Sequence, residues 1–398
     1  MADYFLPRSQ QIAAAIESVS GTAETLDAGD VKLKPFQSDA PFTPEYERFA
    51  NDEVAPDIGE APDFTGGWKA RIAAGFNLQT GGLSGGVIQQ PAIGIYLRAC
   101  GMKQQIVRTI TVGSISPGGS FAEGATFSAT GGKTGIIEAT RSGAGTLRYI
   151  STAGDPIASA DVVTVGADSA TASGTAAIYA YKYTPSGVTQ ESLTIQRGIL
   201  NSEGTASHDS IFRLRGAMGN AVLTFTPSDV VRFAGNFLGV DDEATEDALL
   251  AGYTYETENR PRFRNATIQL NGVDVKVNTV TFDTGNDLQM DPDPSTDGGD
   301  AGYLAAYIAK RTPTIAVAPL RTVASVLDDI GIHRDGTEVA FQLLLNAESA
   351  GTIVELVVPK VQVRTWGIED RGGKQASPMT LNVTRAALTD LDYAIYFR

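Results

Sequence analysis

The stretch "IFRLRGAMGNAVLTF", residues 211–225, has the alternating apolar pattern of a β-strand. Outward from it, residues 230–240, 265–286 and 312–320 are also alternating or β-branched enough to predict strands. The chain of 398 residues contains 43 Gly and 18 Pro, with many Thr and Val residues, a composition that favours short strands and turns over long helices. The sequence therefore predicts a mainly β protein.

Two stretches instead have helical spacing of their apolar residues. Residues 9–19 predict a short helix capped by Ser9, and residues 321–331 predict a second helix that ends at Gly331. The apolar face of the second would consist of Val323, Val326, Leu327 and Ile330. The economical architecture is a β-sandwich with one packed helix. Further strands are expected at 68–78, 94–101, 177–185, 191–198, 338–347, 351–366 and 379–398.

Residues 113–177 differ from the rest, with small residues dominant and few large apolar ones. Within them, residues 119–137 and 155–177 are loosely similar, which predicts two repeated β-hairpins in a small inserted module. The body would then comprise residues 1–112 and 178–398, with the module on its exterior. An insertion at the surface costs little free energy.

The "GGKTG" stretch of the module, residues 131–135, resembles the end of a phosphate-binding loop. Such a loop needs a glycine five residues before its Gly-Lys-Thr, and Phe127 stands there. We therefore expect a tight turn between two strands, supplied by Gly131 and Gly132, and no nucleotide at Lys133.

The net charge of −15 is concentrated in three segments that we interpret as loops. Residues 38–63 carry eight acids and one base, residues 241–258 seven acids, and residues 283–300 six aspartates. The last segment lacks the spacing of a calcium-binding EF-hand loop, which favours a solvated acidic loop; a weak cation site is the alternative. Residues 38–67, which include the first of these segments, have aromatic residues among their acids and predict an arm that docks on another protein. The contact candidates on this arm are Phe42, Tyr46, Arg48 and Phe49.

Few residues suit catalysis or metal binding. The single cysteine, Cys100, is expected to be a small buried residue, and the two histidines, His208 and His333, are too few for a structural zinc site. We expect no enzyme activity, no metal and no cofactor. No apolar run is long enough to span a membrane, and the first residues lack the pattern of a signal peptide, so we expect a chain made and kept in a cytosol.

In "RLRGAMGNAVLTF" and in several stretches before and after it, the chain resembles the major tail tube proteins of long-tailed, non-contractile bacteriophages. The matching stretches succeed one another in the family's order and span most of residues 10–112 and 178–398. The module at 113–177 and the length of the 283–300 segment depart from the family pattern. The matching stretches are "IAAAIESVSGTAETL", "LRACGM", "VRFAGNFLGV", "VTFDTGN", "AKRTPTIAV", "PKVQVRTWGIEDRGGKQASPMTLNVTR" and "DYAIYF".

This resemblance implies a β-sandwich protomer that forms hexameric rings, stacked into a tube through which DNA leaves the capsid. The implied partners are other copies of the chain, a tape measure protein, tail terminator or tail tip proteins, and passing DNA without sequence-specific binding. The implied location is the virion tail, after assembly in the host cytoplasm. Two alternatives are an adhesin or capsid-decorating binding module, and a carbohydrate hydrolase that uses paired carboxylates.

DNA must slide through such a tube without adhering, and a basic lumen would bind its phosphates. We therefore expect parts of the acidic segments to line the lumen, with Lys133 outside; the alternative is that these acids keep a crowded exterior soluble. The lumen candidates are Asp241, Asp242, Glu243, Asp283, Asp287, Asp291 and Asp293.

Overall fold

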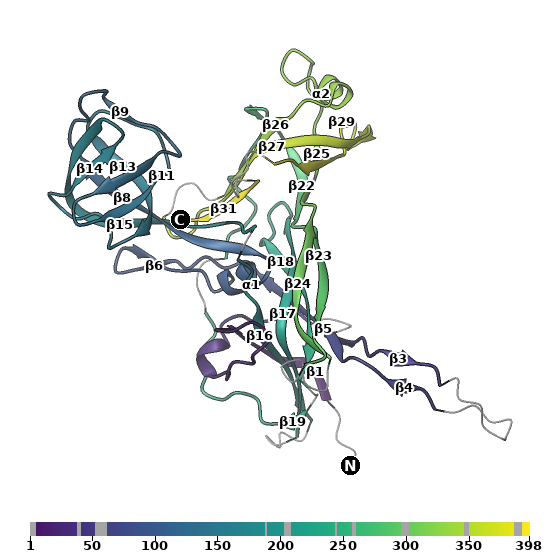
Figure 1. Ribbon diagram of the computed structural model, residues 1–398. Helices are drawn as coiled ribbons and strands as arrows, with labels where there is room; N and C mark the ends of the chain where they lie inside the picture. The colour runs from purple at the N-terminus through teal and green to yellow at the C-terminus, as the bar shows by residue number, and fades with distance from the viewer. Residues whose placement is uncertain are drawn as a thin grey trace.

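The computed structural model describes ten segments of the chain, and strands dominate them. Strands make up 56% of the structure and helices 5%, so the mainly β prediction is confirmed. The protein is elongated, with a side module and a projecting hairpin (Figure 1). The described segments are 5–37, 41–51, 62–187, 189–202, 208–242, 245–256, 260–295, 302–345, 350–385 and 392–398.

The long strand β17 (Asp209–Phe225) organises the lower half of the body. Antiparallel partners flank it in the order β1-β16-β17-β18-β5-β2. Its pairing with β18 shifts between Arg215 and Met218, where Gly216 has φ 58° and a Cβ atom would lie 2.7 Å from the backbone of Ala305. Glycine is therefore required at this bend. The other strands are β1 (Phe5–Ile16), β16 (Leu193–Asn201), β18 (Arg232–Asp241), β5 (Lys69–Asn77) and β2 (Phe42–Pro44).

The upper half of the body is built by the C-terminal strands. The end of β17 also pairs with β22 (Val277–Asp283), and from β22 the strands continue in the order β25-β30-β27-β26-β20-β21. Because β17 belongs to both halves, 21 strands form one continuous hydrogen-bonded sheet. These strands are β25 (Thr314–Pro319), β30 (Met379–Val383), β27 (Val354–Trp366), β26 (Val339–Leu345), β20 (Thr267–Leu270) and β21 (Val273–Asp274).

A single large core lies between these strands, with a cluster of aromatic rings at its centre. Phe76 of β5 lies 4.8 Å from Tyr96 and 6.2 Å from Phe233 of β18, measured between ring centroids, and all three are buried. Tyr96 belongs to the short helix α1 (Gly94–Ala99), which packs against β1, β8 and β17. The strict alternation of burial along β5 directs every second side chain into this core.

Two of the predicted elements have the wrong type. Residues 9–19, predicted as a helix, lie mostly in strand β1, which pairs with β16 from Gln10 to Ile16. Residues 94–101, predicted as a strand, form helix α1. Both stretches are short and buried on more than one side. The spacing of their apolar residues therefore does not distinguish a helix from a strand.

The second predicted helix is displaced toward the C-terminus. Helix α2 (Asp329–Asp335) begins at the end of the predicted 321–331 segment and ends at Gly336, with φ 63°. Its capping residue is Asp328, which accepts a hydrogen bond from the backbone of Gly331 at 2.8 Å. The capping hydrogen bond therefore sets the start of the helix, and the predicted apolar face is wrong because Val323 and Val326 are exposed.

The inserted module is a closed barrel of six antiparallel strands. The pairings run β8-β13-β11-β10-β14-β15 and return from β15 to β8, so no edge remains open. It has a separate core, in which Phe127 meets Tyr149 edge to face at 5.6 Å. The strands are β8 (Met102–Val112), β13 (Gly145–Ala153), β11 (Lys133–Ile137), β10 (Thr126–Ala129), β14 (Val162–Val165) and β15 (Asp168–Pro185).

Both predicted hairpins are present in this barrel, as β10–β11 and β14–β15. Gly131 and Gly132 form the turn of the first hairpin with φ 81° and 76°, as expected for the "GGKTG" stretch. The barrel nevertheless extends past the predicted limits at 113 and 177. It shares β8 and β15 with the body, where β15 also pairs with β31 (Ala394–Phe397).

We predict that the body folds without the barrel. Thr109 and Ala177 face each other across β8 and β15, so a short Gly-rich turn can replace residues 110–176. The main core is untouched, but a small cluster around Val107 and Ala180 loses a neighbour, and one buried ion pair at the base of the barrel loses its carboxylate. We expect cooperative thermal unfolding, with a loss of stability of about 3–5 kcal/mol that comes mostly from this ion pair. A shortened chain that shows no cooperative transition would contradict this independence.

Candidate assembly surface

The segment predicted to be an arm projects from the body as a hairpin (Figure 1). Its strands β3 (Arg48–Phe49) and β4 (Phe64–Thr65) pair with each other and with no other described strand. Of the four contact candidates, Phe42 is not free for a partner, because it lies in β2 and its ring stacks on Phe212 at 4.6 Å. Phe42 therefore fixes the base of the hairpin to the body.

Ion pairs hold the base of the hairpin. The Glu45 carboxylate lies 2.6 Å from Arg71, and the Glu47 carboxylate lies 3.0 Å from Lys69. The Tyr303 hydroxyl also donates to Glu47 at 2.5 Å, and this bond, followed by that of Lys69, lowers the pKa of Glu47. The hairpin leaves the body in a defined direction as a result.

Tyr46 is half exposed, yet its hydroxyl donates to Asp241 at 2.5 Å. It too supports the base of the hairpin.

The outer part of the hairpin exposes two aromatic rings. Phe49 is 57% exposed and Phe64 is 53% exposed, and the two residues are directly paired across the strands. Arg48 beside them is also exposed. We call Phe49 and Phe64 the hairpin patch. Phe64 was not among the contact candidates, although its place in the same predicted arm as Phe49, residues 38–67, could have indicated it.

The first group of lumen candidates lies at the base of the hairpin and is engaged in contacts. Asp241 is buried at the end of β18, where it accepts the Tyr46 hydroxyl. Asp242 lies 3.7 Å from Arg213. Glu243 lies outside the described residues. Asp241 and Asp242 thus have structural partners within the chain.

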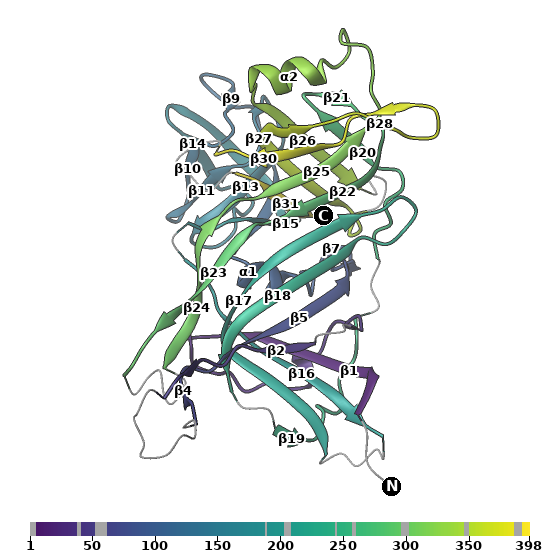
Figure 2. The same cartoon turned by 90° about the vertical axis from the view of Figure 1, so that its right-hand side faces the viewer.

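Two of the second group, Asp287 and Asp291, lie in a strand of a long hairpin and not in a loop, which corrects the interpretation of residues 286–292. Strand β23 (Asn286–Pro292) pairs with β24 (Tyr303–Arg311) along the side of the body (Figure 2). Leu288 and Met290 of β23 pack toward the body, while Asp287 and Asp291 alternate with them and are exposed. The last two candidates are Asp283, which accepts hydrogen bonds from Asn220 and Gly285, and Asp293, which accepts one from Ser295.

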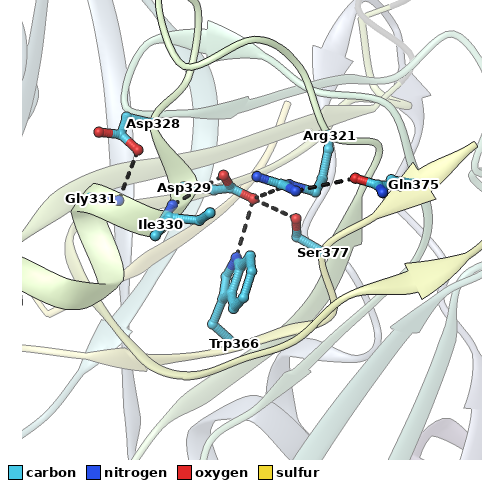
Figure 3. A network of polar contacts seen from close by, with 8 residues as sticks. All are labelled: Arg321, Asp328, Asp329, Ile330, Gly331, Trp366, Gln375 and Ser377. Atoms are coloured by element: carbon cyan, nitrogen blue, oxygen red, sulfur yellow. Dashed lines mark hydrogen bonds and ion pairs between the residues drawn. The ribbon is translucent and has the colours of Figure 1, made fainter.

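A buried carboxylate organises the other end of the body, beside α2 (Figure 3). Asp329 accepts hydrogen bonds from Arg321 at 3.3 Å and Trp366 at 3.1 Å, and another from Ser377. Burial by itself raises the pKa of Asp329, but these hydrogen bonds outweigh it and hold the pKa below its usual value. The network fastens α2 to the end of β27.

The described residues contain no group of three or more His, Cys, Asp and Glu side chains that could hold a metal ion. Cys100 is buried, and this burial raises the pKa of its thiol, which keeps it protonated. Lys133 of the "GGKTG" turn lies 2.6 Å from Asp161 in an ion pair. Within the described part of the chain, no helix is long and apolar enough to cross a membrane.

Comparison of the chain with family models and with curated proteins finds no match.

Proposed function

We propose that this protein is the structural subunit of a bacteriophage tail tube, which assembles into stacked hexameric rings. One observation supports this most directly. The β3–β4 hairpin, whose base is held by ion pairs, exposes the paired side chains of Phe49 and Phe64 away from the body. Exposed aromatic side chains on a rigid support are typical of interface hot spots. Assembly into hexameric rings and a tube is inferred from the resemblance of the sequence to tail tube proteins.

The passing DNA supplies a reason for the acidic row on β23. Asp287 and Asp291 are exposed on one face of the strand, with Gln289 between them, and an acidic wall repels phosphates. We propose that this face borders the lumen. A reconstruction of the assembled protein with a lumen lined mainly by Lys and Arg would contradict the proposal.

Electron microscopy of the purified protein tests the function. Six-fold rings or tubes support a tail tube subunit, whereas isolated monomers or trimers support a binding module that decorates another particle. One observation favours this second candidate: the barrel has its own core and projects to one side of the body (Figure 1).

We predict that replacing both Phe49 and Phe64 by alanine prevents stacking without unfolding the protomer. Both rings are exposed, so the fold loses little, whereas hot-spot aromatics contribute about 2 kcal/mol each at an interface. The concentration needed for tube formation, measured by light scattering, should rise at least about tenfold. Val162→Ala is the matched control, because Val162 is 43% exposed on the barrel and far from the hairpin. Normal tube lengths from the double variant would argue against the hairpin as a contact.

A further inference from the structure

A cavity of about 300 Å³ lies at the foot of the barrel, where β8 and β15 run from the body into the barrel (Figure 1). This volume is at the lower end of the range of about 300–1,000 Å³ found for small-molecule sites. Strands β8 and β15 line one side of the cavity. The barrel lines the other side with three isoleucines of β11 and β13 and with two glutamates, Glu123 and Glu138.

The β8–β15 pairing brings four polar side chains to this cavity. Thr184 lies directly opposite Lys103, and Lys182 lies directly opposite Gln105. Side chains that are directly opposite, or two positions apart on one strand, lie on the same face of a sheet. All four residues line the cavity, whereas the tyrosines that alternate with them in β15 pack into the main core on the other face. The cavity thus has a polar wall that faces away from the main core.

A carboxylate and an ammonium group with unused hydrogen-bonding capacity meet at the cavity. Oε1 of Glu138 accepts from Lys182 at 2.8 Å and from the Tyr396 hydroxyl at 2.7 Å, but among the described residues Oε2 has no partner. The Lys182 ammonium has three donors, of which one goes to Glu138 and one side faces the Tyr396 ring at 5.4 Å. At least one donor and one acceptor are therefore left for a ligand.

Thr184 is an independent sign that this cavity has an occupant. Its side chain is fully buried, and its hydroxyl has no hydrogen-bond partner in the part of the chain that the structure describes. A buried hydroxyl without a partner costs free energy, and buried polar groups nearly always have one. A polar ligand in the cavity that Thr184 lines would supply the missing partner.

We propose that this cavity binds a zwitterionic molecule of the size of a free amino acid. The carboxylate of the ligand accepts hydrogen bonds from Lys182 and Thr184, its ammonium donates to Oε2 of Glu138, and the isoleucines cover its carbon atoms. The cavity contains two ammonium groups, of Lys103 and Lys182, and two carboxylates, of Glu123 and Glu138. A ligand with a single charge would satisfy one sign and be repelled by the other, whereas a zwitterion matches both. The site is separate from the hairpin patch, so the inference does not rest on assembly.

Isothermal titration calorimetry of the full chain with each of the standard amino acids tests the proposal. At least one amino acid should bind with a stoichiometry of one per chain. Its N-acetyl derivative lacks the ammonium and its amide lacks the carboxylate, so each should bind at least about tenfold more weakly. Glucose, which is neutral, is the control and should not bind. The inference would be overturned if no amino acid bound at millimolar concentration, if either derivative bound equally well, or if glucose bound instead.

Thr184→Val locates the site within the fold. The substitution removes the hydroxyl with little change of shape, so the affinity for the bound amino acid should fall about tenfold. The melting temperature without ligand should stay the same or rise, because a buried hydroxyl without a partner is removed. Thr171→Val is the matched control, since Thr171 is exposed on the same strand and does not line the cavity. An unchanged affinity in Thr184→Val would place the ligand elsewhere and refute the inference, and a lowered melting temperature would show that the hydroxyl is structural.

Discussion

Replacing Asp329 by alanine should lower the free energy of unfolding by about 3–5 kcal/mol, the range measured when one partner of a buried ion pair is removed. The Asp329 side chain is 7% exposed and that of Arg321 is 22% exposed, so the guanidinium would lose its partner in a largely dry site. Trp366 and Ser377 would lose their acceptor as well. Urea denaturation followed by tryptophan fluorescence measures the change.

Two variants separate the charge of Asp329 from general damage. Asp329→Asn keeps the size and one acceptor oxygen, so it should lose less stability than the alanine variant. Asp335→Ala removes an exposed ion pair with Arg334 and should change the stability by less than about 1 kcal/mol. Equal losses from the alanine variants at 329 and 335 would show that the buried network adds nothing.

The acid dependence has a defined sign. Because the folded-state pKa of Asp329 lies below its value in the unfolded chain, its ionised form contributes full stability to the fold above that unfolded-state pKa. This stability is lost as the pH falls through the folded pKa. The wild type should therefore lose its advantage over Asp329→Asn in strong acid, and the two unfolding curves should converge there.

The strands were predictable wherever one face is buried and the other is wet. Strand β5 alternates along its whole length, and β18 alternates from Arg232 to Phe237, which is the pattern of a half-buried strand. Strand β1 could not be assigned in this way, because Ile12, Ala13 and Ala14 are all buried in succession. A strand that is covered on both faces has no period of two in its apolar residues.

The acidic hairpin could have been found in the sequence. Residues 286–292, "NDLQMDP", alternate acidic or amide side chains with Leu288 and Met290, which is a strand pattern within a segment interpreted as a loop. The number of aspartates favours a loop, whereas their alternation with apolar residues correctly indicates a strand. By contrast, the hydrogen bond between Tyr46 and Asp241 joins residues 195 positions apart, and nothing local in either segment indicates it.

Besides the shared strands β8 and β15, a buried ion pair joins the barrel to the body, and nothing local in the sequence indicates it. Glu138 of the barrel lies 2.8 Å from Lys182 of β15, with side chains 13% and 7% exposed. The Tyr396 hydroxyl of β31 donates to the same carboxylate at 2.7 Å. Burial, and then the charge of Glu138, raise the pKa of Tyr396, so this hydroxyl stays protonated as the donor.

Replacing Glu138 by alanine should therefore lower the free energy of unfolding by about 3–5 kcal/mol, since the Lys182 ammonium would stay buried without its partner. The double variant Glu138→Leu with Lys182→Met removes both charges, and it should recover most of this loss because apolar side chains can replace a buried pair at little cost. Glu338→Ala, in a pair with Lys360 that is more than 40% exposed on both sides, is the control and should change stability by less than about 1 kcal/mol. A double variant as unstable as the sum of its two single variants would mean that Glu138 and Lys182 are not coupled. Recovery in the double variant would instead show that Glu138 and Lys182 are energetically coupled.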